Sequence, residues 1–187
     1  MEEELKKACD IIRKGGIILY PTDTIWGIGC DATNAEAVQR IYDLKQRPDT
    51  RSMLVLIDSP EYLHQYVREV PDMASDLIAL SVKPLTIIYS GAQNVAPNLI
   101  AQDGSLGIRV TREAFSQQLC RRIKKPLVST SANISGQPAP ANFSEITGEI
   151  LRGVDYAVNY RQQETQKNQA SSIIQLGTGG TVKVIRE

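Results

Sequence analysis

Apolar residues recur at helical spacing near the N-terminus and then give way to a short, continuous apolar run. The helical positions of this first segment are Leu5, Ala8, Cys9 and Ile12. Gly15-Gly16 follows and ends the helix, and Ile17-Ile18-Leu19-Tyr20 is short enough to be a buried strand. The pattern therefore predicts a helix followed by a strand whose end carries Pro21-Thr22-Asp23-Thr24.

A second helical pattern begins near residue 33. Thr33-x-x-Glu36 is a capping box, in which a threonine side chain and a glutamate side chain satisfy the first backbone amides of a helix. We expect the helix to end by Gln46, because Pro48 disfavours helical geometry in the residue before it. The residues of its inner face would be Ala37, Val38, Ile41 and Tyr42.

The rest of the chain alternates between strand and helix patterns and ends in a hairpin. Further strands are predicted over 53–57, 85–89, 107–111, 126–129, 154–158, 171–176 and 181–185. Helices are predicted after Ser59-Pro60, after Pro71-Asp72, over 112–123 and over 142–150. Gly177-Thr178-Gly179-Gly180 joins the last two strands as a hairpin turn. We therefore expect one domain over 1–187, an α/β fold of the α+β type with helices packed on a mixed sheet.

Composition narrows the class of protein. The 187 residues carry 21 Lys plus Arg against 21 Asp plus Glu, which argues against a coat for nucleic acid or for an acidic membrane. Any anion site must be local. No apolar run approaches the ~20 residues of a membrane span, and the acidic start of the chain is unlike a signal peptide. We expect a cytoplasmic protein.

Cysteine and histidine give no sign of a metal centre. Cys9, Cys30 and Cys120 are odd in number and widely spaced, which excludes the common zinc patterns and fits reduced thiols. His64 is the only histidine and falls in a predicted helix, where a surface or packing role is expected. The segment 159–169 is polar and rich in glutamine, and it is predicted to be a loop or flap.

Three polar segments could carry chemistry. In the first, Pro21 to Gly29, small hydroxyl residues precede the only tryptophan and a Gly-x-Gly turn, which suits a pocket rim where backbone approaches a ligand. The same residues also suit an Asx-type turn with Trp26 filling the core.

The second segment, Lys45 to Ser52, holds three cations within seven residues, Lys45, Arg47 and Arg51. A compact ammonium and planar guanidinium groups together suit a polyphosphate. A solvated helix end, with cations complementing the helix dipole, is the alternative.

In the third segment a buried strand ends in Ser129-Thr130-Ser131-Ala132-Asn133-Ile134-Ser135-Gly136. Its hydroxyls and amide could hold a sugar, phosphate or carboxylate, or could satisfy the backbone of the loop itself. Neither a P-loop nor a nucleophile elbow is present.

Taken together, these segments resemble a known family. Pro-Thr-Asp-Thr-x-x-Gly-x-Gly, Lys-x-Arg-Pro, Gly-x-Arg-Val and Ser-Thr-Ser-Ala-Asn-x-Ser-Gly occur in the order and at about the separations of the YrdC family of threonylcarbamoyl-AMP synthases. The resemblance covers essentially the whole chain and matches the short form. It implies a YrdC/RibB-like twisted mixed sheet with a concave cationic cavity.

The resemblance also implies a reaction. L-threonine, bicarbonate and ATP, with Mg²⁺, would give threonylcarbamoyl-AMP and pyrophosphate, the first step towards the threonylcarbamoyl group on adenosine 37 of tRNA. A threonylcarbamoyl-transferase complex and tRNA would be downstream partners. The carbamate oxygen is already an anion, so positioning and charge neutralisation, rather than a protein nucleophile, would carry the chemistry.

The family pattern assigns roles to particular residues. It places Lys45, Arg47, Ser131 and Asn133 in the catalytic set, and no residue as a metal ligand. ATP would be held by Lys45, Arg47, Arg51, Ser105, Ser131, Asn133 and Arg186. Threonine would be held by Thr24, Arg109, Ser129, Ser171 and Ser172.

Two departures and two rival functions remain. Val82-Lys83-Pro84 replaces the Pro-Gly-Pro of many relatives, and Leu56 stands where some carry a histidine. One alternative is a module that binds double-stranded RNA or tRNA without catalysis, against which the zero net charge weighs. The other is carbamoyl-phosphate-linked chemistry, which the lack of zinc-finger and acylphosphatase-like segments disfavours.

Overall fold

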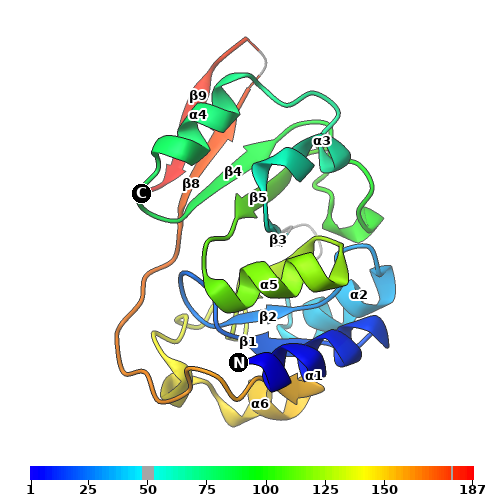
Figure 1. The fold of residues 1–187 in the computed structure, drawn as a ribbon, viewed down its shortest axis with the longest axis vertical. Coiled ribbons are helices and arrows are strands. Elements are labelled where there is room, and N and C mark those ends of the chain that lie inside the picture. The colour runs from blue at the N-terminus through cyan, green and yellow to red at the C-terminus, as the bar shows by residue number, and fades with distance from the viewer. Residues whose placement is uncertain (48–52, 178) are drawn as a thin grey trace.

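The computed structural model describes residues 1–47, 53–177 and 179–187, and a mixed sheet forms its framework (Figure 1). The strands in the described ranges are β1 Ile18–Tyr20, β2 Gly27–Gly29, β3 Leu54–Ile57, β4 Leu85–Tyr89, β5 Leu106–Val110, β6 Leu127–Ser131, β7 Tyr156–Ala157, β8 Ser172–Leu176 and β9 Val182–Arg186. Their order across the sheet is β7-β1-β2-β6-β3-β5-β4-β8-β9. The pairs β1–β7, β3–β5 and β4–β8 are parallel and the others are antiparallel. The predicted mixed sheet is thus confirmed.

Helices pack on this sheet, as the sequence predicts. They are α1 Glu2–Arg13, α2 Ala35–Leu44, α3 Leu63–Tyr66, α4 Met73–Leu80, α5 Ala114–Ile123 and α6 Gly148–Gly153. Short 3₁₀ turns occur at η1 Pro60–Tyr62, η2 Pro97–Leu99 and η3 Phe143–Glu145. In Figure 1, α1 and α5 lie side by side against the half of the sheet that holds β1 and β2.

The core divides between the two faces of the sheet. Ile18 and Tyr20 of β1 pack with α1 and α5 in one cluster, whereas Leu19 belongs to a second cluster that includes the inner face of α2. Because successive side chains of a strand point to opposite faces, a strand covered on both faces must be apolar throughout. This explains the unbroken apolar run at 17–20.

The predicted Gly-x-Gly turn is wrong, because Gly27–Gly29 forms the strand β2 between β1 and β6. The glycines are required by close approach. A Cβ atom at Gly29 would collide with the carbonyl oxygen of Val128 and lie 2.6 Å from Cε1 of Tyr20. The tyrosine hydroxyl crosses this gap and donates a hydrogen bond to the Val128 carbonyl oxygen over 3.0 Å.

The predicted cap of α2 is also wrong by one residue. Asn34, not Thr33, is the N-cap, and its Oδ1 accepts a hydrogen bond from the amide of Ala37 over 3.1 Å. The Thr33 hydroxyl instead donates to Oδ1 of Asp31 over 2.7 Å, which makes it part of the preceding turn. The inner face of the helix and its end before Gln46 are confirmed.

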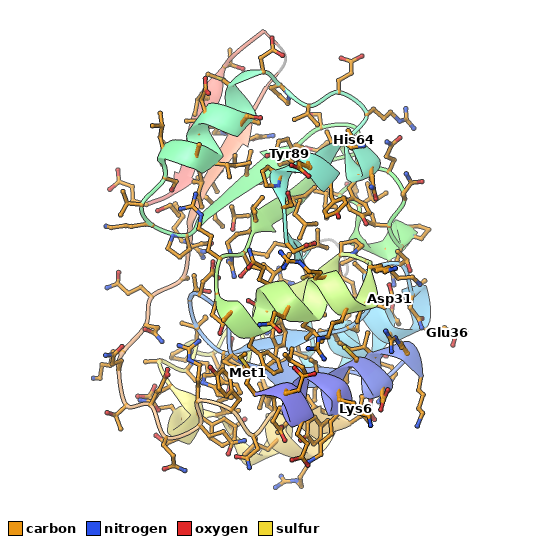
Figure 2. All side chains as sticks on the ribbon, viewed as in Figure 1. Met1, Lys6, Asp31, Glu36, His64 and Tyr89 are labelled. Atoms are coloured by element: carbon orange, nitrogen blue, oxygen red, sulfur yellow. The ribbon has the colours of Figure 1, made fainter. Side chains whose placement is uncertain are left out.

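The helix predicted over 142–150 is split and displaced. Ile146 is buried in extended backbone between η3 and α6, so the chain must leave helical geometry there to place this side chain in the core. The hairpin of β8 and β9 is confirmed. Segment 159–169 contains neither helix nor strand. His64 lies in α3 and is exposed, as expected (Figure 2), and all three cysteines are buried free thiols.

Candidate functional site

A cavity of about 260 Å³ lies across the middle of the sheet. Its walls come from β2, β3, β4, β5, β6, β8 and β9, from the turn after β1 and from Arg47, which follows α2. Eight residues assigned to the site from sequence line this cavity: Thr24, Arg47, Ser105, Arg109, Ser129, Ser131, Ser171 and Arg186. Among residues 1–47, 53–177 and 179–187, the lining includes three arginines and no carboxylate. This cavity is therefore suited to an anionic ligand.

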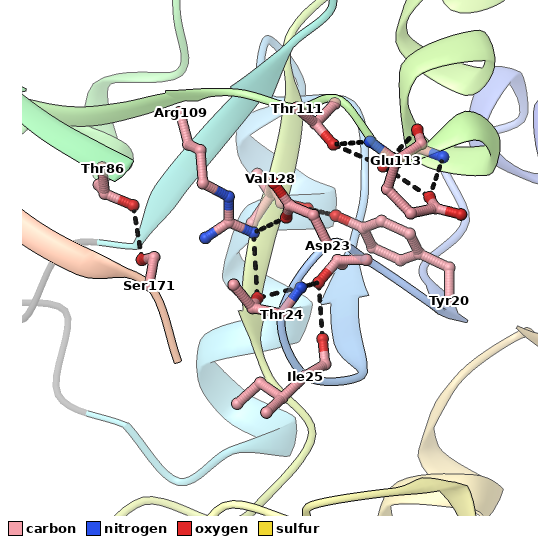
Figure 3. Close-up of polar contacts among 12 residues, drawn as sticks. Tyr20, Asp23, Thr24, Ile25, Thr86, Arg109, Thr111, Glu113, Val128 and Ser171 are labelled. Carbon is pink, nitrogen blue, oxygen red and sulfur yellow. Dashed lines mark hydrogen bonds and ion pairs between the residues drawn. The ribbon is translucent and has the colours of Figure 1, made fainter. Parts of the chain in front are cut away.

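One end of the cavity is built around Arg109 of β5, whose side chain is 3% exposed. Its Nη2 lies 3.0 Å from Oδ1 of Asp23 and donates a hydrogen bond to Oγ1 of Thr24 over 3.3 Å (Figure 3). The buried Nε of Arg109 has no hydrogen-bond partner within the described part of the chain. Since an unsatisfied buried N–H is costly, this guanidinium is prepared to bind a further acceptor, such as a ligand carboxylate.

Burial and charge act in opposite directions on Asp23. Burial raises the pKa of its carboxyl group, and the neighbouring Arg109 charge lowers it. Glu113, at the N-cap of α5, contributes a further rise in the Asp23 pKa. Asp23 therefore pairs with Arg109 and Glu113 lies near Asp23, and neither carboxylate is among the described residues that line the cavity.

The threonine hydroxyls at this end have determined directions. Oγ1 of Thr22 donates to the carbonyl oxygen of Ile25 over 2.7 Å, and its one hydrogen is used there. Oγ1 of Thr24, 3.0 Å from Oγ1 of Thr22, must therefore be the donor between the two hydroxyls. Oγ1 of Thr24 accepts a hydrogen bond from Arg109 and donates its own hydrogen to Oγ1 of Thr22. Towards a ligand, this hydroxyl can therefore act only as an acceptor.

Lys45 lies behind the other end of the cavity and does not line it. Its Nζ donates to the carbonyl oxygens of Ser131 and Asn133, the second over 2.6 Å, and only 1% of the residue is exposed. Burial, with the charge of Arg47 added, lowers the pKa of Lys45 to about 7. In this structure the lysine fixes the turn that carries Ser131 and Asn133.

The side-chain amide of Asn133 uses its nitrogen in hydrogen bonds but leaves its oxygen without a donor among the described residues. Its Nδ2 donates to the carbonyl oxygens of Ile134 and Gln137, over 3.0 and 2.7 Å. Its Oδ1 is buried and has no hydrogen-bond partner within the ranges that the structure describes. This oxygen keeps an unused capacity to accept a hydrogen bond, although Asn133 does not line the cavity.

The third wall joins β4 to the C-terminal hairpin. Oγ1 of Thr86 lies 2.8 Å from Oγ of Ser171, and Arg186 donates through Nε and Nη2 to the Ser171 carbonyl oxygen over 2.9 and 2.7 Å. Partial burial and the charge of Arg109 lower the pKa of Arg186, which places both cations within electrostatic reach of each other. The chain from Ala170 to Ile173 therefore enters the site with its backbone held on both sides.

The structure brings most, but not all, of the predicted site residues to one cavity. Lys45 and Asn133 lie just outside the lining. Asn133 belongs to the turn at 131–133, and Lys45 donates hydrogen bonds to the carbonyl oxygens of that turn. Ser172 is also outside, because its neighbours Ser171 and Ile173 line the cavity and side chains alternate along a strand. Arg51 lies outside the described residues.

Sequence reasoning missed three contributors. Thr86 is a buried hydroxyl in an otherwise apolar strand, and that exception was its only signal. Glu113 and Arg161 meet beside Asp23 through contacts between distant segments, which no local pattern reveals.

The described residues show neither a metal-binding cluster nor a membrane-spanning helix. Within residues 1–47, 53–177 and 179–187, no three His, Cys, Asp or Glu side chains gather in a way that could hold a metal ion. None of the helices in these ranges combines the length and the apolar character that crossing a membrane requires.

Threonylcarbamoyl-AMP synthases of other organisms are similar to this protein over most of its length. A threonylcarbamoyl-AMP synthase from Pseudoalteromonas translucida is 32% identical over 161 residues, which cover 84% of this chain and 86% of that protein. One from Vibrio campbellii is 32% identical over 185 residues, 94% of this chain and 98% of that protein.

Solved structures share the fold. P. abyssi Sua5 complexed with L-threonine superposes with a TM-score of 0.87 at 24% identity, covering 100% of this chain and 54% of that one. This chain thus spans about half of that protein. E. coli YciO superposes with a TM-score of 0.83 at 25% identity, covering 100% and 90%.

A family model described as "Telomere recombination" and named for Sua5, YciO and YrdC matches residues 10–187. With nearly the whole chain matched and the predicted motifs gathered on one cavity, the protein belongs to the Sua5/YciO/YrdC family.

Proposed function

We propose that this protein is a threonylcarbamoyl-AMP synthase, which condenses L-threonine, bicarbonate and ATP to threonylcarbamoyl-AMP and pyrophosphate. The observation that carries the proposal is the convergence of the separate polar segments on one cavity, whose described lining has three arginines and no carboxylate. The names of relatives that match over most of their length support the same activity.

The two ends of the cavity fit the two substrates. At one end, Nε of Arg109 pairs with the threonine carboxylate, beside the Thr24 hydroxyl, and Ser129 and Ser171 complete the wall. At the other end, Arg47 neutralises the phosphates of ATP, with Ser105 and Ser131 as hydrogen-bond partners, and Arg186 contributes a second positive charge from the wall that it shares with Ser171. Asn133, which does not line the cavity, supports Ser131 from the same turn. Lys45 acts from behind, by holding the 131–133 turn.

The site suits a reaction that needs positioning more than proton transfer. The threonine amine and bicarbonate form a carbamate with loss of water. A carbamate oxygen then attacks the α-phosphorus of ATP, and the bond to pyrophosphate breaks. Arginines fixed around the triphosphate stabilise the charge that develops on the leaving group.

Mg²⁺ fits this site as the counter-ion of ATP. Within the part of the chain that the structure describes, the lining offers hydroxyl groups but no carboxylate, whereas a resident magnesium is usually anchored by one or two carboxylates. We therefore place Mg²⁺ with the phosphates as part of the MgATP substrate. We also propose that the unstable adenylate passes to a threonylcarbamoyl-transferase complex that modifies tRNA.

Pyrophosphate release tests the activity. The protein should release pyrophosphate from ATP only when threonine and bicarbonate are both present. Arg109→Ala should lower kcat/KM for threonine at least a hundredfold, because it removes the proposed carboxylate partner.

Arg152→Ala, which changes an exposed arginine of α6, is the matched control and should behave like the wild type. Pyrophosphate release that ignores threonine, or an Arg109→Ala enzyme that keeps its affinity for threonine, would contradict the proposal.

A further inference from the structure

Arg161 stands out in the polar segment 159–169. It is a non-glycine residue with a left-handed backbone, φ 63°, a conformation that costs free energy and persists where surrounding contacts hold it. Its side chain is 24% exposed. The contacts that hold it extend towards the turn after β1, next to the threonine end of the cavity.

The guanidinium of Arg161 joins three parts of the chain. Nη1 lies 3.2 Å from Oε1 of Glu113 and donates to the carbonyl oxygen of Thr22 over 3.3 Å. Nε and Nη2 each lie 2.8 Å from a carboxylate oxygen of Glu164, within the same segment. Arg161 thus ties the polar segment to the turn that carries Asp23 and Thr24 and to the start of α5.

Glu113 has a second attachment that fixes its position. Its Oε2 accepts hydrogen bonds from the amide and the hydroxyl of Ser116, over 2.7 and 2.8 Å, and caps α5 (Figure 3). The side chain is 11% exposed. The negative charge of Glu113 therefore stays beside Asp23 even when the Arg161 side chain is removed.

The charges around Arg109 balance only when Arg161 is counted. Asp23 pairs with Arg109, which leaves Glu113 as a second, poorly solvated carboxylate near the place where a substrate carboxylate is to bind. Arg161 pairs with this carboxylate. Glu164 lies farther out and is 42% exposed, so water compensates it more fully.

We propose that Arg161 is a positioning residue for threonine recognition, which neutralises Glu113 and holds the Thr22 backbone so that Arg109 receives the amino-acid carboxylate beside Thr24. This inference rests on the proposed function for the identity of the ligand. Removing Arg161 leaves Glu113 unpaired, and its negative charge then repels an anionic substrate group through a partly buried region.

Arg161→Ala should weaken threonine binding about tenfold and leave ATP binding unchanged, because the arginines proposed to bind phosphate are distinct residues. Titration calorimetry measures each dissociation constant directly, with threonine added in the presence of a non-hydrolysable ATP analogue. Arg121→Ala is the matched control, since Arg121 also forms an ion pair, with Asp58, but outside the cavity. It should bind both ligands like the wild type.

A second substitution separates charge from loop structure. Gln at position 113 keeps an oxygen that can cap α5 but removes the negative charge, so the double variant Arg161→Ala/Glu113→Gln should recover threonine binding to within about threefold of the wild type. A purely structural role for Arg161 predicts no recovery.

The inference is overturned if Arg161→Ala binds threonine normally, if Glu113→Gln fails to rescue it, or if the wild type binds no threonine. Threonine binding with the predicted rescue but without pyrophosphate release would instead contradict the proposed function alone.

Discussion

Lys45 shows how a residue that reads as a surface cation can act from the interior. It caps α2, where a lysine complements the helix dipole, yet its ammonium group reaches the carbonyl oxygens of Ser131 and Asn133 and is almost fully buried. The loss of water around the charge is the main reason that its pKa falls to about 7.

This lowered pKa makes stability depend on pH. Between pH 7 and about 10.5 the unfolded chain keeps the Lys45 proton while the folded chain loses it, so the free energy of unfolding rises with pH in that window. Relative to Lys45→Met, the wild type should gain roughly 2 kcal/mol between pH 7 and pH 9. Urea unfolding of both proteins at the two pH values measures this difference. Parallel pH profiles would contradict the assignment.

At the scale of residues, the sequence predicted which residues belong to the site better than it predicted where their side chains lie. The hydroxyl-rich segments and the arginines of the site could be recognised from their types and order. The position of Lys45 behind the turn could not, because it depends on where β6 ends relative to α2, two elements that are distant in sequence. The pairing of Glu113 with Arg161 was hidden for the same reason.

At the scale of elements, β2 is the piece that sets the geometry of the threonine end. It is only three residues long and lies between β1, which leads to Thr24, and β6, which carries Ser129. Tyr20 and Val128 approach so closely over Gly29 that no side chain fits there.

Gly29→Ala should therefore destabilise the fold by roughly 3 kcal/mol, because the new methyl group meets backbone that cannot move away. Gly107→Ala is the matched control in β5, since its Cβ would meet Leu54 and Thr86 at 3.4 Å, close to ordinary contact. Thermal unfolding of the two variants should give a large fall in Tm for the first and a small change for the second. Equal changes would contradict this description of β2.

The elements that the sequence predicted well are those with a continuous or strongly periodic apolar pattern. β1, β4 and α5 follow this rule, because burial against the sheet alone decides them. The prediction of a turn at β2 was wrong because glycines required by close strand packing look the same in sequence as glycines required by a turn. The prediction of one helix over 142–150 failed because burial of the Ile146 side chain outweighed the local preference for helix.

At the scale of the molecule, the equal numbers of acidic and basic residues conceal a local asymmetry. Arg47, Arg109 and Arg186 line one cavity, whose described lining has no carboxylate, while acids such as Glu2 and Glu3 are exposed on α1. The predicted concave cationic cavity is thus present, on the scale of a nucleotide and an amino acid. Its composition from seven strands and the turn after β1 follows from the strand order, which the sequence did not reveal without the family resemblance.

The product itself gives the most direct test of the proposed function. The protein is incubated with MgATP, L-threonine and ¹³C-labelled bicarbonate, and the reaction is examined at once by mass spectrometry. We predict a species with the mass of threonylcarbamoyl-AMP that carries one ¹³C atom and requires threonine. Active, folded protein that consumes ATP without forming this labelled adenylate would contradict the proposed function.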